Sequence, residues 1–452
     1  MAFWDKTYQY SSVRLFTFIC VVLCLGMMPF ASSSGYTSYV YTLGIFIAFN
    51  FMCDKDHREK NFAYFHFFLV LAFLVYFLQR VQLPHYMGLT GPEGGIGTDD
   101  VRYYAGLDVK ITYTTDRMDI AMDNPYTNLL RIVYPFKIGN PIDIVIFNIL
   151  GIAFMPYLTY KTARIFFDDE RISFIAERLT LFCPFMMSIG LIIMRDVMCS
   201  SLILASFCCF AQKKYIPFAL FTGLLAFLKF GFVVFLCVPM FAFLVYRENQ
   251  KSMSQSTSRL KFLILSAIIL AVFVIFILPN LATLTGGRLT SESLFRDSFL
   301  EYLEGANDES ILVKLYALPV VIRIPALIVT FLVIPPLTFN IYSEHIFLIR
   351  SFLQNVMAPI YWWPLYLFFF KFLFSYRKLN AAAKTIFYIL IFMALALGMI
   401  SLQTRHKAAL LPFFYIAISY SIVHLGRSRR FISLICLIFF IIAQIIYSYL
   451  HL

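Results

Sequence analysis

The chain has little charge for its length, and this shortage sets its class. Only 14% of its 452 residues are charged, whereas 61% are apolar, 18% are aromatic and Phe alone occurs 52 times. A soluble domain of this length could not bury so much apolar surface. The composition therefore predicts an all-α, polytopic integral membrane protein.

The chain also lacks the short motifs of several protein classes. It has no Gly-rich phosphate loop ending in Gly-Lys-Ser/Thr, no His-Glu-x-x-His and no soluble nucleotide-sugar domain. These absences disfavour an ATP-driven pump, a zinc protease and a cytosolic enzyme that uses nucleotide sugars. No internal repeat with matching interrupted helices is evident, which weakens the case for a transporter.

Cysteine is scarce outside the apolar runs, and charge of one sign dominates. None of the nine cysteines lies in a long polar loop, and their spacing matches no zinc or redox motif, so we expect them to be small packing residues. The formal charge of +12 comes from Lys and Arg in short clusters between apolar runs. Such clusters anchor membrane topology, and we expect no nucleic-acid partner.

Long apolar runs are abundant. A spanning helix needs about 20 apolar residues, and thirteen stretches are candidates. A further apolar stretch, 311–336, carries Arg323 and several prolines and is expected to be re-entrant or to lie along the membrane surface. The thirteen predicted spans are near 15–31, 36–53, 62–79, 141–159, 179–194, 197–212, 215–228, 231–246, 262–280, 356–375, 385–402, 408–424 and 431–449.

The distribution of Lys and Arg predicts the orientation of these spans. With the N-terminus inside, the basic clusters fall in the inner loops. The chain, 1–452, is then one membrane domain with its C-terminus outside. It has two large outer loops, 80–140 with an acidic motif and 281–355 with the re-entrant or surface-lying stretch.

The acidic motif is Gly97-Thr98-Asp99-Asp100, in the first outer loop. Carboxylates at the edge of a bilayer can position a sugar hydroxyl or a divalent metal. Alternatively, the two Asp residues cap a short helix beginning at Val101.

Other ionisable residues fall at three outer turns: Arg195 with Asp196, Lys229, and Arg405-His406-Lys407. The hairpin arms beside the first two turns have about 16 residues and span roughly 24 Å, short of a hydrocarbon core of about 30 Å. A charge within the membrane is costly unless it faces a cavity or a partner, which makes these turns functional candidates. The alternatives are a mutual ion pair of Arg195 with Asp196 and an interfacial anchor at 405–407.

The aromatic residues of the outer segments and one histidine allow two readings each. Tyr126, Tyr361 and Trp362 could stack on sugar faces, although interfacial belts contain the same residue types. His66 in an apolar span is expected to be a satisfied packing residue rather than a ligand.

The order of these motifs resembles a known family. Gly97-Thr98-Asp99 after three spans, Tyr103 or Tyr104, Arg195 opening a later span, and the turn Lys213-Lys214 are similar to bacterial O-antigen and exopolysaccharide polymerases of the Wzy and EpsG kind. The acidic pair, with Arg405-His406-Lys407 before an apolar run, is also similar to the GT-C class of membrane glycosyltransferases. Two departures leave polymerase and single-sugar transferase open: the acidic motif follows the third span instead of the first, and Lys229 stands where polymerase-like chains often have His.

The resemblance implies a glycosyltransferase that uses a polyprenyl-diphosphate-linked sugar or oligosaccharide in surface-polysaccharide assembly. It implies a bacterial cytoplasmic membrane with the site facing outward, other polysaccharide-assembly proteins as partners, and either no cofactor or a divalent metal, Mg²⁺ or Mn²⁺. Asp99 and Asp100 would be the catalytic or metal-binding carboxylates. The substrate would be bound by Arg195, Lys229, Arg405, His406, Arg323, Tyr103 and Tyr104.

Two other functions stay open from the sequence. One is a GT-C-like transferase that adds a single sugar to a lipid, glycan or protein. The other is a flippase or transporter of lipid-linked sugars, which predicts essential charges on both sides of the membrane.

Overall fold

The computed structural model describes residues 6–82, 125–133, 140–229, 231–251, 341–343, 346–400, 404–426 and 430–450, with a few isolated positions from 319 to 339. Within these ranges the fold is helical, apart from one antiparallel pair of two-residue strands. The elements in chain order are α1 (Lys6–Ala31), α2 (Gly35–Phe51), α3 (Lys55–Gln82), α6 (Pro125–Val133), α7 (Pro141–Phe166), α8 (Glu170–Leu181), α9 (Pro184–Gly190), α10 (Asp196–Ala211), α11 (Tyr215–Lys229), α12 (Gly231–Lys251), β1 (Tyr342–Ser343), β2 (Ile346–Phe347), α18 (Ile349–Ser351), the π-helical turn η3 (Phe352–Met357), α19 (Ala358–Phe374), the 3₁₀ turn η4 (Tyr376–Lys378), α20 (Ala381–Ile400), the 3₁₀ turn η5 (Thr404–Ala409), α21 (Leu411–His424) and α22 (Arg430–Leu450).

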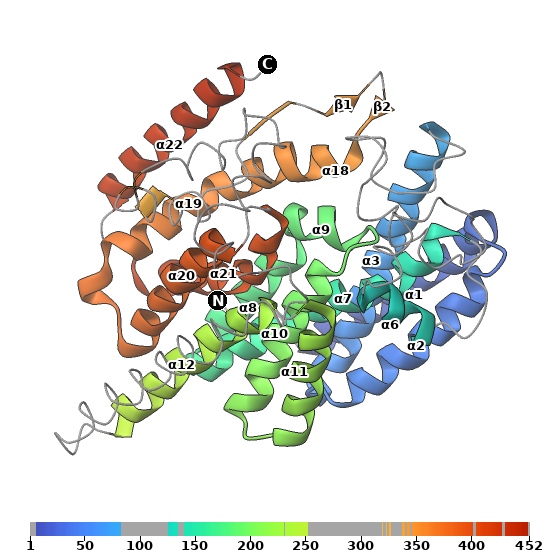
Figure 1. Ribbon diagram of the computed structural model, residues 1–452, viewed down its shortest axis with the longest axis horizontal. Coiled ribbons are helices and arrows are strands. Elements are labelled where there is room, and N and C mark those ends of the chain that lie inside the picture. Colours follow the sequence, from blue (N-terminus) through green and yellow to red (C-terminus); the bar gives the residue numbers. More distant parts are fainter. Residues whose placement is uncertain are drawn as a thin grey trace.

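Helix α7 lies at the core of the bundle, with α1–α3 to one side and α19–α22 to the other (Figure 1). It is apolar on all sides, as expected for a helix surrounded by protein, and 89% of its most apolar stretch is buried. Gly151 lets α10 approach closely, because a Cβ at this position would lie 2.8 Å from the Cα of Met198. The hydroxyl of Ser201 on α10 donates a hydrogen bond to the Gly151 carbonyl.

Helices α7 and α10 run in the same direction. Near their first residues, Asn148 Nδ2 donates to the carbonyl of Ile192, 2.6 Å away and just before α10. Near their last residues, the rings of Phe166 and Phe207 stack with centroids 5.7 Å apart. Both helices therefore begin at one end of the bundle and finish at the other.

The periphery of the bundle is apolar. Phe30 on α1 is 82% exposed and Phe439 on α22 is 69% exposed, and similar side chains surround them. Such a surface is suited to lipid and not to water. The chain is therefore a helical membrane protein. By length and hydropathy, five of its described helices can cross a bilayer: Ser11–Ala31, Lys55–Val81, Pro141–Phe166, Gly231–Gln250 and Ile349–Phe374.

Helices occupy most of the predicted stretches that fall within the described residues, although α10, α11 and α21 are shorter apolar helices, as are the segments Ala381–Leu397 of α20 and Arg430–Ile446 of α22. The predicted span 262–280 and nearly all of 311–336 lie outside the described residues. The thirteen-span count therefore stays a prediction.

The predicted span 179–194 contains a break. Helix α8 ends at Leu181, α9 begins at Pro184, and the two are bent by 52°. Proline has no N–H to continue the helical ladder, and it disfavours the helical conformation at the preceding Cys183. The bend divides this crossing into two short pieces before the chain reaches Arg195.

Candidate functional site

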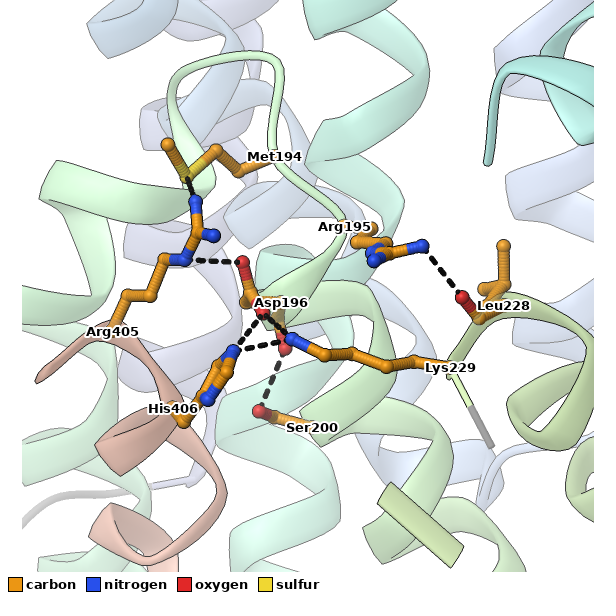
Figure 2. Close-up of polar contacts among 8 residues, drawn as sticks. All are labelled: Met194, Arg195, Asp196, Ser200, Leu228, Lys229, Arg405 and His406. Atoms are coloured by element: carbon orange, nitrogen blue, oxygen red, sulfur yellow. Dashed lines mark hydrogen bonds and ion pairs between the residues drawn. The ribbon is translucent and has the colours of Figure 1, made fainter. Parts of the chain in front are cut away.

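A buried carboxylate, Asp196, lies at the centre of a charged cluster (Figure 2). Its Oδ1 is 3.0 Å from Lys229 Nζ and 3.2 Å from His406 Nε2. Its Oδ2 is 3.4 Å from Arg405 Nε. The side chain of Asp196 is 4% exposed, whereas that of Lys229 is 20% exposed. Asp196 is therefore covered by cations that retain some access to the surroundings.

Helix ends explain why these charges meet. Asp196 is the first residue of α10, where the positive end of the helix dipole favours a carboxylate. Lys229 is the last residue of α11, where the negative end favours a cation. Because α10 and α11 are consecutive helices joined by a tight turn, the start of one lies beside the end of the other. Turn η5 then brings Arg405 and His406 to the same place from far along the chain.

His406 is neutral in this setting. It lies in the connection between α20 and α21, and burial first, with the Lys229 ammonium second, lowers the pKa of its imidazole to about 4. Lys229 Nζ donates a hydrogen bond to His406 Nε2, which assigns the ring hydrogen to Nδ1. Among the described residues that Nδ1 has no hydrogen-bond partner, although His406 is 5% exposed.

Phe232 forms an apolar side of the cluster. Lys229 Nζ lies 4.4 Å from the centre of its ring, a cation–π contact. The ring of His406 meets Phe232 edge-on, with centroids 5.0 Å apart and planes at 86°. These contacts hold the ammonium and the imidazole against each other.

Arg195 points away from Asp196 and toward α11 (Figure 2). Its Nη1 donates a hydrogen bond of 2.9 Å to the carbonyl of Leu228. The alternative of a mutual Arg195–Asp196 ion pair is therefore wrong. The carboxylate pairs instead with Lys229 and Arg405 from other segments.

The predicted anchor at 405–407 is also wrong as a single unit. An interfacial anchor reaches headgroups and water, but His406 and Lys407 are buried. Lys407 turns into the core, where its Nζ lies 4.2 Å from the centre of the Trp362 ring. Only Arg405 and His406 of this segment join the Asp196 cluster.

Three of the sequence-predicted substrate residues, Lys229, Arg405 and His406, are thus brought together, and Arg195 lies beside them. The remaining candidates lie outside the described residues. They are Asp99, Asp100, Tyr103, Tyr104 and Arg323.

The sequence reasoning gave Asp196 too small a role. The sequence places it with Arg195 at one outer turn and gives it no role in the site, yet it is the residue on which Lys229 and Arg405 converge. The available signal was a lone carboxylate at a hairpin tip between apolar helices, where an unpaired charge is costly.

His66, Tyr126 and Trp362 all lie in the core, although a packing role was predicted for His66 alone. His66 is satisfied, with Nε2 2.8 Å from the Tyr39 hydroxyl and Nδ1 2.8 Å from the Phe62 carbonyl, which confirms its structural interpretation. Tyr126 and Trp362 are fully buried, so they are packing residues and offer no face to a sugar.

The electrostatic character of the site follows from its charge count. Arg195, Lys229 and Arg405 carry three positive charges, Asp196 carries one negative charge and the neutral His406 adds none. The excess of two positive charges at the end of an apolar bundle suits a multiply charged anion. Among the described residues, no group of three or more His, Cys, Asp or Glu side chains is placed to hold a metal ion.

Comparisons of the chain with protein-family models, with curated proteins and with solved structures found no match.

Proposed function

We propose that the chain is an integral membrane glycosyltransferase that takes a sugar or oligosaccharide from a polyprenyl-diphosphate-linked donor, with repeat-unit polymerisation as its most specific form. The convergence of Lys229 and Arg405 on one buried carboxylate, with Arg195 beside them, carries this proposal. These residues come from three separate connections of the bundle. A lipid diphosphate is the anion that such an end of a membrane bundle would meet.

The reaction places specific demands on the site. The oxygen of an acceptor hydroxyl attacks the anomeric carbon, the bond from that carbon to the diphosphate oxygen breaks, and the electron pair leaves with the lipid diphosphate. Arg195, Lys229 and Arg405 would stabilise this departing charge. The hydroxyl proton would pass to a carboxylate, for which the resemblance offers Asp99.

The predicted membrane topology is part of this proposal. Thirteen spans with the N-terminus inside would place the Asp196 cluster on the outer side of a bacterial cytoplasmic membrane. The diphosphate headgroup of a translocated lipid carrier would then lie at the depth of Lys229 and Arg405.

A complementation assay tests the proposal. Surface glycolipids from a strain lacking the protein are separated on a gel after complementation with wild type, Lys229→Ala, Lys161→Ala or Asp99→Ala. Lys161 is a matched control because its Nζ lies 2.6 Å from Asp54 Oδ2 and its side chain is 23% exposed, close to the value for Lys229. It lies near the last residues of α7, at the opposite end of the bundle.

We expect the null strain to lose the long glycan ladder and keep single capped repeats, which identifies a polymerase. Lys229→Ala and Asp99→Ala should fail to restore the ladder, whereas Lys161→Ala should restore it. Full activity of Lys229→Ala would contradict the proposed site. A ladder of normal length with an altered sugar indicates the single-sugar transferase, and equal loss in Lys161→Ala with unextended repeats on the inner leaflet indicates a flippase.

A further inference from the structure

The carboxylate of Asp196 occupies the position that an anionic ligand would take. Its two oxygens contact Lys229, Arg405 and His406 at 3.0 to 3.4 Å. Carboxylate and phosphate oxygens accept hydrogen bonds from ammonium and guanidinium groups in similar geometry. The Asp196 carboxylate therefore already occupies the donors of Lys229 and Arg405 that a phosphate oxygen would use.

The contact between Asp196 and Arg405 is that of a partner that can be displaced. Arg405 reaches the carboxylate through Nε at 3.4 Å, while its Nη1 lies 3.4 Å from the Met194 sulfur, a weak acceptor. The pair is thus not the bidentate arrangement that makes an arginine–carboxylate contact strong. The covering cations are partly exposed, Lys229 at 20% and Arg405 at 15%.

His406 supplies an independent observation. Its buried Nδ1 carries a hydrogen and has no acceptor among the described residues. A buried donor without an acceptor is unfavourable, because it has lost its hydrogen bond to water and gained none in the protein. A ligand oxygen that arrives as the cluster rearranges would satisfy this donor, so the described protein groups alone leave the site incomplete.

We propose that Asp196 is an internal counter-anion of an anion-binding site. It holds Lys229 and Arg405 in place when the site is empty, and it gives up these contacts when a phosphate group of the substrate binds. This inference rests on the proposed function, because it takes the lipid diphosphate as the displacing anion. Asp196 is a positioning residue and not a catalytic one.

The proposal predicts that Asp196→Asn raises the affinity for diphosphate and lowers the stability of the empty protein. Without the carboxylate, the anion no longer competes for Lys229 and Arg405, and the positive charge of the site rises by one. Diphosphate should bind more tightly. The empty protein should be less stable, because buried cations lose their partner. A purely structural ion cluster predicts the loss of stability alone.

The experiment measures binding of inorganic diphosphate to the full-length protein in lipid nanodiscs by calorimetry. We expect Asp196→Asn to lower the Kd about tenfold relative to wild type, the size expected when one charge-assisted contact no longer has to be broken. Asp54→Asn is the matched control, since Asp54 pairs with Lys161 at the other end of the bundle, and its Kd should equal that of wild type.

The outcomes separate the two proposals. If wild type binds diphosphate and Asp196→Asn binds it equally or less well, the counter-anion role is overturned and the diphosphate site stands. If neither protein binds diphosphate, the proposed function is overturned, and the counter-anion role with it.

A second measurement needs no variant at Asp196. The side-chain NMR signals of ¹⁵N-labelled His406, assigned with His406→Gln, are followed in wild-type protein as diphosphate is added. We expect them to shift because Lys229, which donates to His406 Nε2, turns from Asp196 to the phosphate. Signals that stay unchanged while calorimetry reports binding would overturn the inference.

Discussion

Asp196 and His406 show at the residue scale how a membrane bundle tolerates charge. A buried carboxylate is stable because cations from two other segments reach it, and an imidazole beside an ammonium is stable because it is neutral. Each group depends on the others, so substitutions within the cluster are expected to couple and not to add.

His406 gives the protein a pH dependence of known sign. Its folded pKa of about 4 lies below the ordinary value of 6.5, so the unfolded state binds more protons between these values. The stability gained from the neutral ring is complete above about pH 6.5 and is lost as pH falls toward 4. The midpoint of thermal unfolding in detergent should fall more steeply for wild type than for His406→Gln as the pH is lowered from 7.5 to 4.5. Parallel curves would contradict this assignment.

Gly151 provides a prediction about packing at a single residue. Gly151→Ala should destabilise the protein by about 1–3 kcal/mol, because the added Cβ would overlap the backbone of Met198. Gly223→Ala is the matched control in α11, where an added Cβ meets nothing within 4 Å. It should be neutral or slightly stabilising. Thermal unfolding midpoints in detergent measure both changes, and equal midpoints would count against the close α7–α10 contact.

At the scale of elements, the turn between α10 and α11 decides which helix ends meet. The chain leaves α10 with Lys213 in the left-handed region, at φ 60°, while Lys214 N–H donates to the Cys209 carbonyl at 2.9 Å. This is the position after a helix where glycine is preferred. The tight turn returns the chain along α10 and places Lys229 beside Asp196.

Lys213→Gly should therefore stabilise the protein by about 1 kcal/mol, because glycine adopts the left-handed region without strain. Lys214→Gly has the same change of side chain at a position without positive φ and should give no gain. The unfolding midpoints of the two variants are compared in one detergent. A gain in Lys214→Gly, or none in Lys213→Gly, would argue against the turn conformation.

At the scale of the whole molecule, the bundle has two chemically different ends. Ser34 in the α1–α2 turn donates a hydrogen bond of 2.6 Å to Asp143, at the start of α7 and thus at the Asp196 end. At the other end lie the Lys161–Asp54 pair and the Lys213-Lys214 turn. The predicted topology assigns these ends to opposite sides of the membrane.

Single cysteines test that assignment in intact cells. A membrane-impermeant maleimide should label Ser33→Cys, in the exposed α1–α2 turn, from outside. Lys214→Cys, also exposed, should be labelled only after permeabilisation. The protein without either substitution is the control, because it shows how much label the nine native cysteines take up. The reverse pattern would invert the topology and turn the Asp196 cluster inward.

The sequence by itself determined the membrane class and the approximate extent of most described helices, because apolar length and composition are local properties. It also identified Lys229, Arg405 and His406 as ionisable residues in unusual positions. It did not show that the chain bends between two helices before Pro184, nor that Lys407 and Trp362 are buried. Only the tertiary structure decided that Asp196 pairs with distant cations and not with Arg195. Ion pairing depends on which helix ends the turns bring together. The sequence around Asp196 or around Arg405 does not by itself indicate that the two residues are in contact.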